Sequence, residues 1–131
     1  MTEYIVAKVF LENADGSILV LRRSKTAPRR ALEWDLPGGW VESHEDPLTA
    51  AIRELEEEAG VRLHSLSETL KTVDERDNEI IIRHYFIGIT EHPEITLSYE
   101  HDRFKWVSKD DFAKTMLYEP HVKAFSKVYK R

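Results

Sequence analysis

The chain has 131 residues, of which 41% are hydrophobic and 33% charged, and we expect one soluble globular domain over residues 1–131. It contains no cysteine, which excludes disulfides, thiolate metal sites and a cysteine nucleophile. The start lacks a basic leader and no apolar run approaches the length of a membrane span, so we expect a cytoplasmic protein with no membrane partner. The net charge of −5 argues against a nucleic-acid polymer as partner.

The acidic excess is confined to one short segment. Residues 42–58 hold seven acidic side chains and one basic side chain, whereas the other 114 residues hold 17 acidic and 18 basic ones. The chain is therefore a nearly neutral domain that carries one concentrated acidic motif.

The first forty residues predict strands and turns. Apolar runs at 5–11 and 18–21, separated by turn-forming residues, predict a hairpin with a longer loop. Residues 24–30 are polar and basic and predict a loop. Residues 36–39, with two glycines after a proline, predict a special backbone feature that permits positive φ and close approach.

The middle of the chain predicts a helix with well-marked ends. Asp46 is a typical N-cap, Pro47 suits the first helical position, and Gly60 is a typical residue just beyond a C-terminus. At about 100° per residue, one arc of this helix is apolar and is expected to face the core. That arc comprises Leu48, Ala51, Ile52, Leu55 and Ala59.

The remaining elements alternate between strands and helices. Residues 69–73, 80–89 and 104–107 predict strands. Residues 108–111 resemble a capping box that starts a short helix, and Glu119 followed by proline opens a last amphipathic helix. Mixed strands with segregated helices predict an α/β or α+β domain.

Three carboxylates share a second face of the central helix. Glu54, Glu57 and Glu58 are spaced i, i+3 and i+4, so they repel one another, and the nearby C-terminal end of the helix disfavours anions. Clustered hard oxygen ligands suit Mg²⁺ or Mn²⁺. The alternative is a solvated acidic face in which Arg53 pairs with Glu57.

The residues around this cluster match a known signature. Gly39 is followed six residues later by Glu45, and residues 53–61 read Arg-Glu-Leu-Glu-Glu-Glu-Ala-Gly-Val. This pattern resembles the Nudix box at every specified position, over Gly39 to Val61. We therefore identify the chain as a MutT-like member of the Nudix hydrolase family, a resemblance that implies an α/β/α sandwich with a mixed sheet and the loop-helix-loop of the box.

The resemblance implies roles for the box residues. Nudix hydrolases cleave a nucleoside diphosphate linked to another moiety with Mg²⁺ or Mn²⁺. Glu57 and Glu58 would be metal ligands, Glu54 a ligand or the base that positions water, and the carbonyl of Gly38 a further ligand. Gly39 and Gly60 would be structural.

Three further residues receive roles by resemblance. Arg53 and Glu45 would orient the catalytic glutamates, with Glu45 structural. Glu100, six residues before Trp106, occupies the position of a general-base or metal-binding glutamate in MutT-type members; the alternative is an ordinary exposed loop residue.

Basic and aromatic residues provide the candidate substrate contacts. Arg22 and Arg23 end a predicted strand, so at most one of them points into a cleft to hold phosphate. Arg29 and Arg30 are interpreted as a solvated basic loop. Trp34 could stack on a base or belong to the core.

The substrate class is narrowed by what is absent from the sequence. The proline and the tyrosine typical of ADP-ribose and dinucleoside polyphosphate hydrolases are missing beyond the box, which favours a (deoxy)nucleoside triphosphate cleaved to monophosphate and pyrophosphate. Tyr118 replaces the asparagine that can read oxidised guanine, and it is a candidate for stacking on the base. The alternatives are an ADP-ribose or other nucleotide-derivative pyrophosphatase, and a non-catalytic nucleotide-sensing module. We expect a monomer or homodimer.

Overall fold

The computed structural model describes residues 1–130 and comprises seven strands and three helices; Arg131, the last residue of the predicted domain, lies outside this range. The strands are β1 (Thr2–Glu12), β2 (Ile18–Arg23), β3 (Trp34–Asp35), β4 (Gly38–Trp40), β5 (Ser67–Arg76), β6 (Glu79–Ile89) and β7 (His101–Val107). The helices are α1 (Pro47–Ala59), α2 (Phe112–Thr115) and α3 (Glu119–Val128). Across residues 1–130, none of the helices has the length and apolar character needed to cross a membrane.

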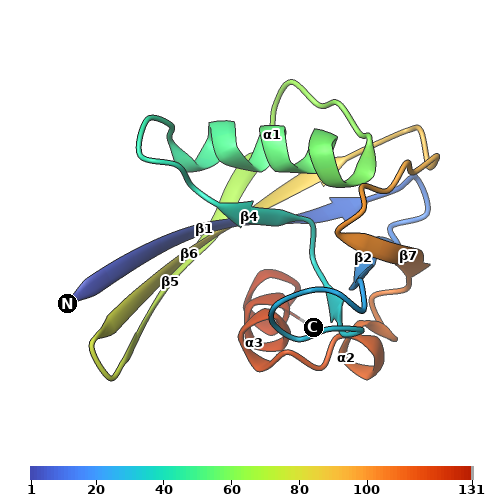
Figure 1. Cartoon of the computed structure of the whole chain (residues 1–131). Coiled ribbons are helices and arrows are strands. Elements are labelled where there is room, and N and C mark those ends of the chain that lie inside the picture. Colours follow the sequence, from blue (N-terminus) through green and yellow to red (C-terminus); the bar gives the residue numbers. More distant parts are fainter. Residues whose placement is uncertain (131) are drawn as a thin grey trace.

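All the strands belong to one mixed sheet. Its order is β3-β2-β1-β6-β5, with β4 also paired to β1 and β7 to β2. The β1–β6 pair is parallel and runs from Thr2↔Glu79 to Glu12↔Ile89, whereas the other pairs are antiparallel. In Figure 1, β1, β5 and β6 extend together as a long twisted ribbon away from the helices.

Helices cover both faces of the sheet. Helix α1 lies above it and helices α2 and α3 lie below it (Figure 1). Successive side chains of a strand point to opposite faces. Val9 and Leu11 therefore pack in the cluster beneath α1, whereas Phe10 packs against Phe112 and Phe125 of the other helices. The predicted α/β/α sandwich is confirmed.

The predicted hairpin is right only at its base. Strands β1 and β2 share the single pair Glu12↔Ile18, after which β2 pairs with β7. The edge of β1 that a regular hairpin would use is occupied by β4, at Val6↔Trp40 and Lys8↔Gly38. The segment predicted as a special backbone feature thus contributes a short strand in the middle of the sheet.

Helix α1 has the predicted ends. The Asp46 side chain accepts a hydrogen bond from the Thr49 amide at 2.7 Å, and Gly60 ends the helix with φ of 72°. The predicted apolar arc needs one correction, because Leu48 is 39% exposed while Ala50 is fully buried. The buried face is therefore rotated toward the carboxylate cluster, and Ala50 brings that side of the helix close to the sheet.

Candidate active site

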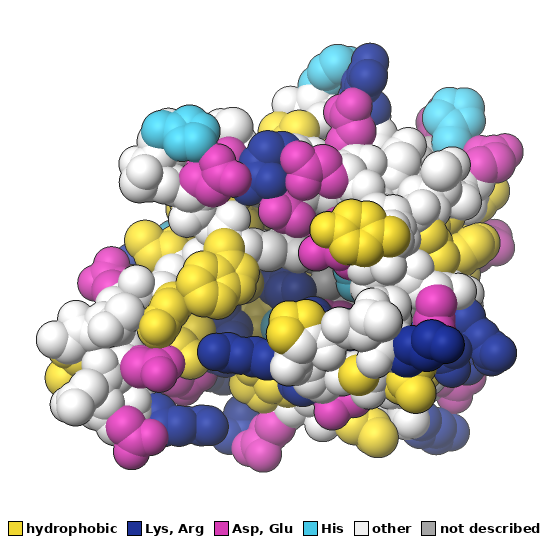
Figure 2. Space-filling model, viewed as in Figure 1, with side chains coloured by type: hydrophobic (Ala, Val, Ile, Leu, Met, Phe, Trp, Pro, Cys, Tyr) yellow, Lys and Arg dark blue, Asp and Glu magenta, His cyan; other side chains and the backbone are white. Residues whose placement is uncertain are grey.

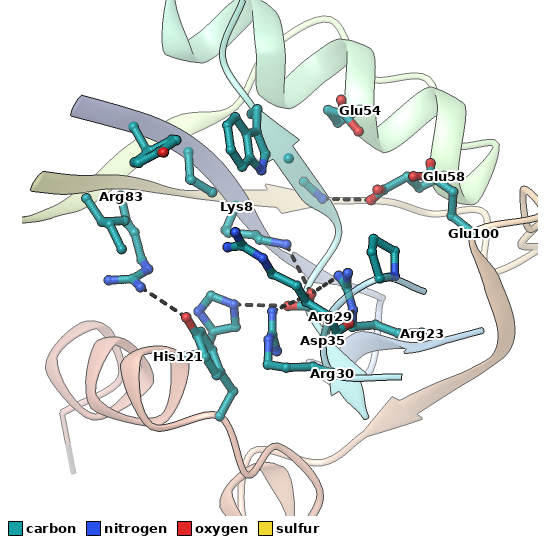
Figure 3. A pocket seen from close by; sticks show the side chains of 18 of the residues that line it. Lys8, Arg23, Arg29, Arg30, Asp35, Glu54, Glu58, Arg83, Glu100 and His121 are labelled. Carbon is teal, nitrogen blue, oxygen red and sulfur yellow. Dashed lines mark hydrogen bonds and ion pairs between the residues drawn. The ribbon is translucent and has the colours of Figure 1, made fainter. Parts of the chain in front are cut away.

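A cavity of about 640 Å³ opens between α1 and α3, and Figure 2 shows a hollow at the centre of the molecule in the same view as Figure 1. Its charged lining residues are divided between two ends. Carboxylates gather at the α1 end and cationic side chains near α3 (Figure 3). The acidic end holds Glu42, Glu54, Glu58 and Glu100, and the cationic end holds Lys8, Arg23, Arg29, Arg30 and Arg83. Two further carboxylates, Asp35 and Glu79, line the cavity outside the acidic end.

Glu58 is the most enclosed carboxylate of the acidic end. It is 5% exposed, and its Oε1 accepts a hydrogen bond from the Gly38 amide at 2.9 Å. Burial raises the pKa of Glu58 to about 8, although the nearby charge of Lys8 and the Gly38 hydrogen bond oppose the rise. Burial therefore destabilises the charged form of Glu58, and a cation bound beside it would stabilise that form.

Glu54 lies one turn earlier on the same side of α1. Burial raises its pKa as well, while its hydrogen bond with Arg53 opposes the rise. A Cβ atom at Gly39 would lie 2.9 Å from Cδ of Glu54, which is closer than side chains tolerate. Gly39 is therefore required for the Glu54 carboxylate to occupy this place.

Arg53 joins the carboxylates of the box. Its guanidinium donates to Glu45 at 2.6 and 3.1 Å, to Glu54 at 2.8 Å and to Glu57 at 3.2 Å. The hydrogen bonds with Glu45 raise the pKa of Arg53, so that its charge is constant at any working pH. Arg53 and Glu45 therefore orient Glu54 without lining the cavity themselves.

Glu57 is not placed with the other two carboxylates. Its side chain is 56% exposed and paired with Arg53, and it is absent from the described residues that line the cavity. The i, i+4 spacing of Glu54 and Glu58 keeps those two on one side, whereas Glu57 is rotated toward solvent and attracted by the guanidinium. Of the three predicted cluster carboxylates, Glu54 and Glu58 thus line the cavity, whereas Glu57 pairs with Arg53 beside it.

We expect replacement of Gly38 by alanine to disrupt both the sheet and the acidic end. The φ of Gly38 is +135°, and an added Cβ would lie 2.0 Å from the Ala7 carbonyl oxygen in the central strand. Strain and overpacking together should cost at least about 3 kcal/mol, measured by urea unfolding. The control is Gly16→Ala, where the nearest atom lies at 3.6 Å and only the φ of +80° is unfavourable. An equal loss of stability in the two variants would contradict this assignment.

The cationic end is built around one buried carboxylate. Oδ2 of Asp35 accepts from Lys8 at 3.3 Å, Arg23 at 3.1 Å and Arg30 at 3.2 Å. Burial alone would raise the pKa of Asp35, but the surrounding positive charges, with that of Lys8 foremost, hold it well below its usual range. Asp35 is therefore ionised and holds the three cations in place.

His121 extends this network into α3. Its Nε2 lies 3.0 Å from Oδ1 of Asp35, and its Nδ1 lies 2.8 Å from the Tyr85 hydroxyl. Burial lowers the pKa of His121 to about 4, because the enclosed site disfavours a charged ring; Asp35 opposes this shift, and Lys8 and Arg30 add to it. We therefore assign a neutral ring that donates to Asp35 and accepts from Tyr85.

We expect the free energy of unfolding to fall as the pH drops from 6.5 toward 4. In this range an unfolded histidine, with pKa near 6.5, takes up a proton that folded His121 does not, so acid favours unfolding. At pH 5 the loss from His121 alone should be about 2 kcal/mol. Urea unfolding at pH 7.5 and pH 5 should show a smaller pH effect in His121→Gln, whereas identical slopes for both proteins would count against a neutral buried ring.

Three residues predicted to contact the substrate have surroundings that differ from that prediction. Arg22 forms two 2.8 Å hydrogen bonds with Asp102, and Trp34 packs against the core beside Lys105, so neither belongs to the described cavity lining. Tyr118 lines the cavity, but the guanidinium of Arg30 covers one face of its ring at 3.8 Å. Of Arg22 and Arg23 at the end of β2, only Arg23 is among the described residues that line the cavity, because successive side chains of a strand point to opposite faces.

Sequence reasoning missed most of the cationic end. Arg29 and Arg30 were expected to be solvated, yet both line the cavity, and Lys8, Asp35 and His121 were given no site role. Weak signals existed, since Lys8 interrupts an apolar strand and His121 falls on the apolar side of the last helix. Their convergence depends on contacts between β1, β3 and α3 that no local pattern encodes.

The donor chemistry of the acidic end fits Mg²⁺ or Mn²⁺. Within residues 1–130, no three acidic or histidine side chains converge closely enough to form a complete ligand set. The fit instead rests on the enclosed carboxylate of Glu58, with Glu54 beside it and Glu100 lining the same cavity. Oxygen donors of this kind are the ligands that hard divalent cations prefer.

Comparisons with known proteins identify the family. The family model described as NUDIX domain matches residues 3–128. A crystal structure of a MutT protein from Methanosarcina mazei is 27% identical, with a TM-score of 0.84 over 99% of this chain and 97% of that one. The solution structure of the Escherichia coli ORF135 protein is 25% identical, with a TM-score of 0.81 over 97% of this chain and 89% of that one. The chain therefore belongs to the NUDIX domain family, and its fold resembles that of a MutT protein.

Curated relatives match over shorter segments. An RNA pyrophosphohydrolase from Acidiphilium cryptum is 49% identical over 45 residues, which are 34% of this chain and 27% of the relative. The first curated relatives are thus matched over less than a third of their own length.

Proposed function

We propose that the protein is a divalent-metal-dependent pyrophosphohydrolase that cleaves a (deoxy)nucleoside triphosphate to the monophosphate and pyrophosphate. The observation that carries this proposal is the division of one cavity into an acidic and a cationic end. The acidic end suits metal ions, and the cationic end suits the negative charge of a polyphosphate.

The acidic end would hold Mg²⁺ or Mn²⁺ through side-chain and main-chain oxygens. Glu58, Glu54 and Glu100 line the cavity, and we propose them as ligands together with Glu57 and the carbonyl of Gly38. Glu57 would take part by leaving Arg53, with which it forms only an exposed ion pair. The bound ion would supply neutralisation of phosphate charge and a lowered pKa for attacking water.

A residue of the box would also accept the proton of the attacking water. Glu54 is held by Arg53 at 2.8 Å and has a raised pKa, two properties that suit a carboxylate that accepts a proton near neutral pH. Glu100 is the alternative base. The leaving pyrophosphate would be charged, and Arg23 is placed in the cavity to bind phosphate oxygens.

The base of the nucleotide would meet aromatic side chains. Trp40 is 57% exposed and lines the cavity next to Tyr4, with the two ring centroids 5.0 Å apart. An exposed indole provides a flat apolar surface on which a base can stack. We therefore assign Trp40 the stacking role that the sequence had suggested for Trp34, with Tyr118 at the cationic end of the same cavity.

A nucleotide panel with Mg²⁺ tests this proposal. We expect release of pyrophosphate and monophosphate from ribo- or deoxyribonucleoside triphosphates, faster than products form from ADP-ribose, nucleotide sugars or dinucleoside polyphosphates. Faster cleavage of ADP-ribose or another derivative would establish the alternative pyrophosphatase activity. Binding of these nucleotides without turnover of any would instead indicate a nucleotide-sensing module.

The remaining proposals concern the protein as a whole. We propose that residues 1–131 form a single Nudix hydrolase domain that acts in the cytoplasm as a monomer or homodimer. Its partner would be a small nucleotide rather than a nucleic-acid polymer or a membrane. The intact box, with every specified residue present, favours the enzyme over the sensing module.

A further inference from the structure

The cationic end of the cavity carries more positive charge than its own carboxylates neutralise. Lys8, Arg23 and Arg30 all bond to one oxygen of Asp35, whose single negative charge cannot balance three cations. Arg29 adds a fourth cation. The charge of Arg83 is balanced by Asp74, and Arg83 also donates to the Tyr118 hydroxyl. Two further acids lie outside the acidic end: Glu33, which pairs with Arg30 at 3.8 Å, and Glu79, which lines the cavity. A net positive charge therefore remains after these internal pairs are counted.

The same region offers hydrogen-bond donors rather than acceptors. Oδ1 of Asp35 accepts from the Leu36 amide at 2.8 Å and from His121 at 3.0 Å, and its Oδ2 is shared by the three cations. The second nitrogen of His121 is engaged by Tyr85. A ligand group placed here would meet guanidinium and ammonium N–H groups, so acceptor-rich ligands are favoured.

Two of the arginines have N–H groups that donate no hydrogen bond to the described residues. Arg29 lines the cavity, and within residues 1–130 its guanidinium has no hydrogen bond or ion pair. Arg30 is fixed by stacking on Tyr118, and its Nη1 has no hydrogen-bond partner, with Glu33 Oε1 at 3.8 Å. Because the Arg30 guanidinium is already held in place, it loses little entropy when it binds an anion in a bidentate manner.

We propose that this end of the cavity binds a second anionic group of the substrate, a phosphate monoester remote from the anhydride bond that is cleaved. Arg29 and Arg30 are its principal contacts, and Lys8 and Arg23 contribute to the positive potential. This inference rests on the proposed function, because it takes the acidic end as the place of the anhydride. Among the nucleotides of the proposed function, it favours those that carry such a phosphate in addition to the anhydride that is cleaved.

Binding without metal separates this inference from catalysis. Matched probes are NADP⁺ with NAD⁺, and coenzyme A with dephospho-coenzyme A, because each pair shares its pyrophosphate and differs by one phosphate monoester. Calorimetry in EDTA should show the phosphorylated member of at least one pair binding at least tenfold more tightly. The additional phosphate of that member accepts charge-assisted hydrogen bonds from the protein, which the other member of the pair cannot form.

Single substitutions test whether Arg29 and Arg30 cause the tighter binding of the phosphorylated probe. Arg29→Gln should reduce this preference to about threefold or less without changing thermal stability, because the side chain forms no hydrogen bond or ion pair with the described residues 1–130. Arg30→Gln should do the same, and Arg29→Gln remains decisive if Arg30→Gln unfolds. The control is Arg62→Gln, whose exposed side chain pairs with Glu56 outside the cavity and should keep the full preference.

Several results would overturn the inference. These are equal affinity of the parent protein for both members of each pair, no measurable binding of any probe, or equal effects of Arg29→Gln and Arg62→Gln. Triphosphate hydrolysis without any phosphate preference would also overturn it while leaving the proposed function intact. A clear preference in a protein that hydrolyses no nucleotide would support the binding site and refute the hydrolase.

Discussion

Replacing Glu54 with glutamine is expected to lower kcat on the preferred nucleotide by about 10²–10⁴ at saturating Mg²⁺. Glutamine keeps the size of the side chain but can neither accept the proton nor contribute a negative charge to a metal. Arg53 would keep its bonds to Glu45, so the box should remain folded. Steady-state kinetics over a range of Mg²⁺ concentrations distinguish a lost base from a weakened metal site.

Glu56→Gln is the matched control for this experiment. Glu56 lies on the same helix, occupies the unspecified position of the box, and forms an exposed pair with Arg62 at 2.9 Å. Its loss should leave kcat within about twofold, since exposed ion pairs contribute little. If Glu54→Gln retained activity within a few fold of the parent, the role assigned to Glu54 would be wrong.

The second large effect is expected for Asp35→Asn, on stability rather than on chemistry. Asparagine removes the one negative charge shared by Lys8, Arg23 and Arg30 and leaves enclosed cations without a counter-charge. Breaking a buried pair in this way costs about 3–5 kcal/mol, which corresponds to a fall in Tm on the order of 10 °C or more. Urea unfolding at pH 7.5 measures this loss of free energy of unfolding.

Asp102→Asn provides the comparison. Asp102 forms two short hydrogen bonds with Arg22, but both side chains are partly exposed, at 37% and 23%. Its replacement should therefore lower the free energy of unfolding far less than Asp35→Asn does. Equal losses in the two variants would mean that the Asp35 network does not hold the cavity wall together.

The elements that could be predicted are those encoded by neighbouring residues. Asp46, Pro47 and Gly60 mark the ends of α1 through local hydrogen bonds and backbone preferences. The spacing of the box likewise identified the carboxylates before their positions were known. Sequence patterns alone therefore predict an α/β or α+β domain and the acidic character of α1, whereas the sandwich architecture is implied by the resemblance to the Nudix family.

The cationic end could not be predicted because distant segments form it. Lys8 and Asp35 are 27 residues apart, and Asp35 and His121 are 86 apart. The loop that carries Arg30 turns back toward the cavity through positive φ values of 48° at Arg30 and 66° at Leu32, which neither residue type favours. A basic, polar loop with no glycine gives no sign of this turn.

The position of Glu57 shows a different limit of prediction from the sequence. Helical spacing makes Glu54, Glu57 and Glu58 neighbours along α1, but it does not determine which partner each carboxylate takes. Arg53 competes for Glu57 at 3.2 Å, while Gly38 binds Glu58 at 2.9 Å. Side-chain choices of this kind depend on charges brought together by the whole fold.

Dependence of nucleotide hydrolysis on a divalent metal tests the central claim most directly. The protein is stripped with EDTA, returned to buffer with or without Mg²⁺, and assayed for pyrophosphate release from the preferred nucleoside triphosphate. We expect no turnover without metal, full recovery on addition of Mg²⁺, and no recovery for Glu58→Gln at the same concentration. Hydrolysis that persists in EDTA, or a Glu58→Gln variant that recovers like the parent, would contradict the assignment of the acidic end as the catalytic metal site.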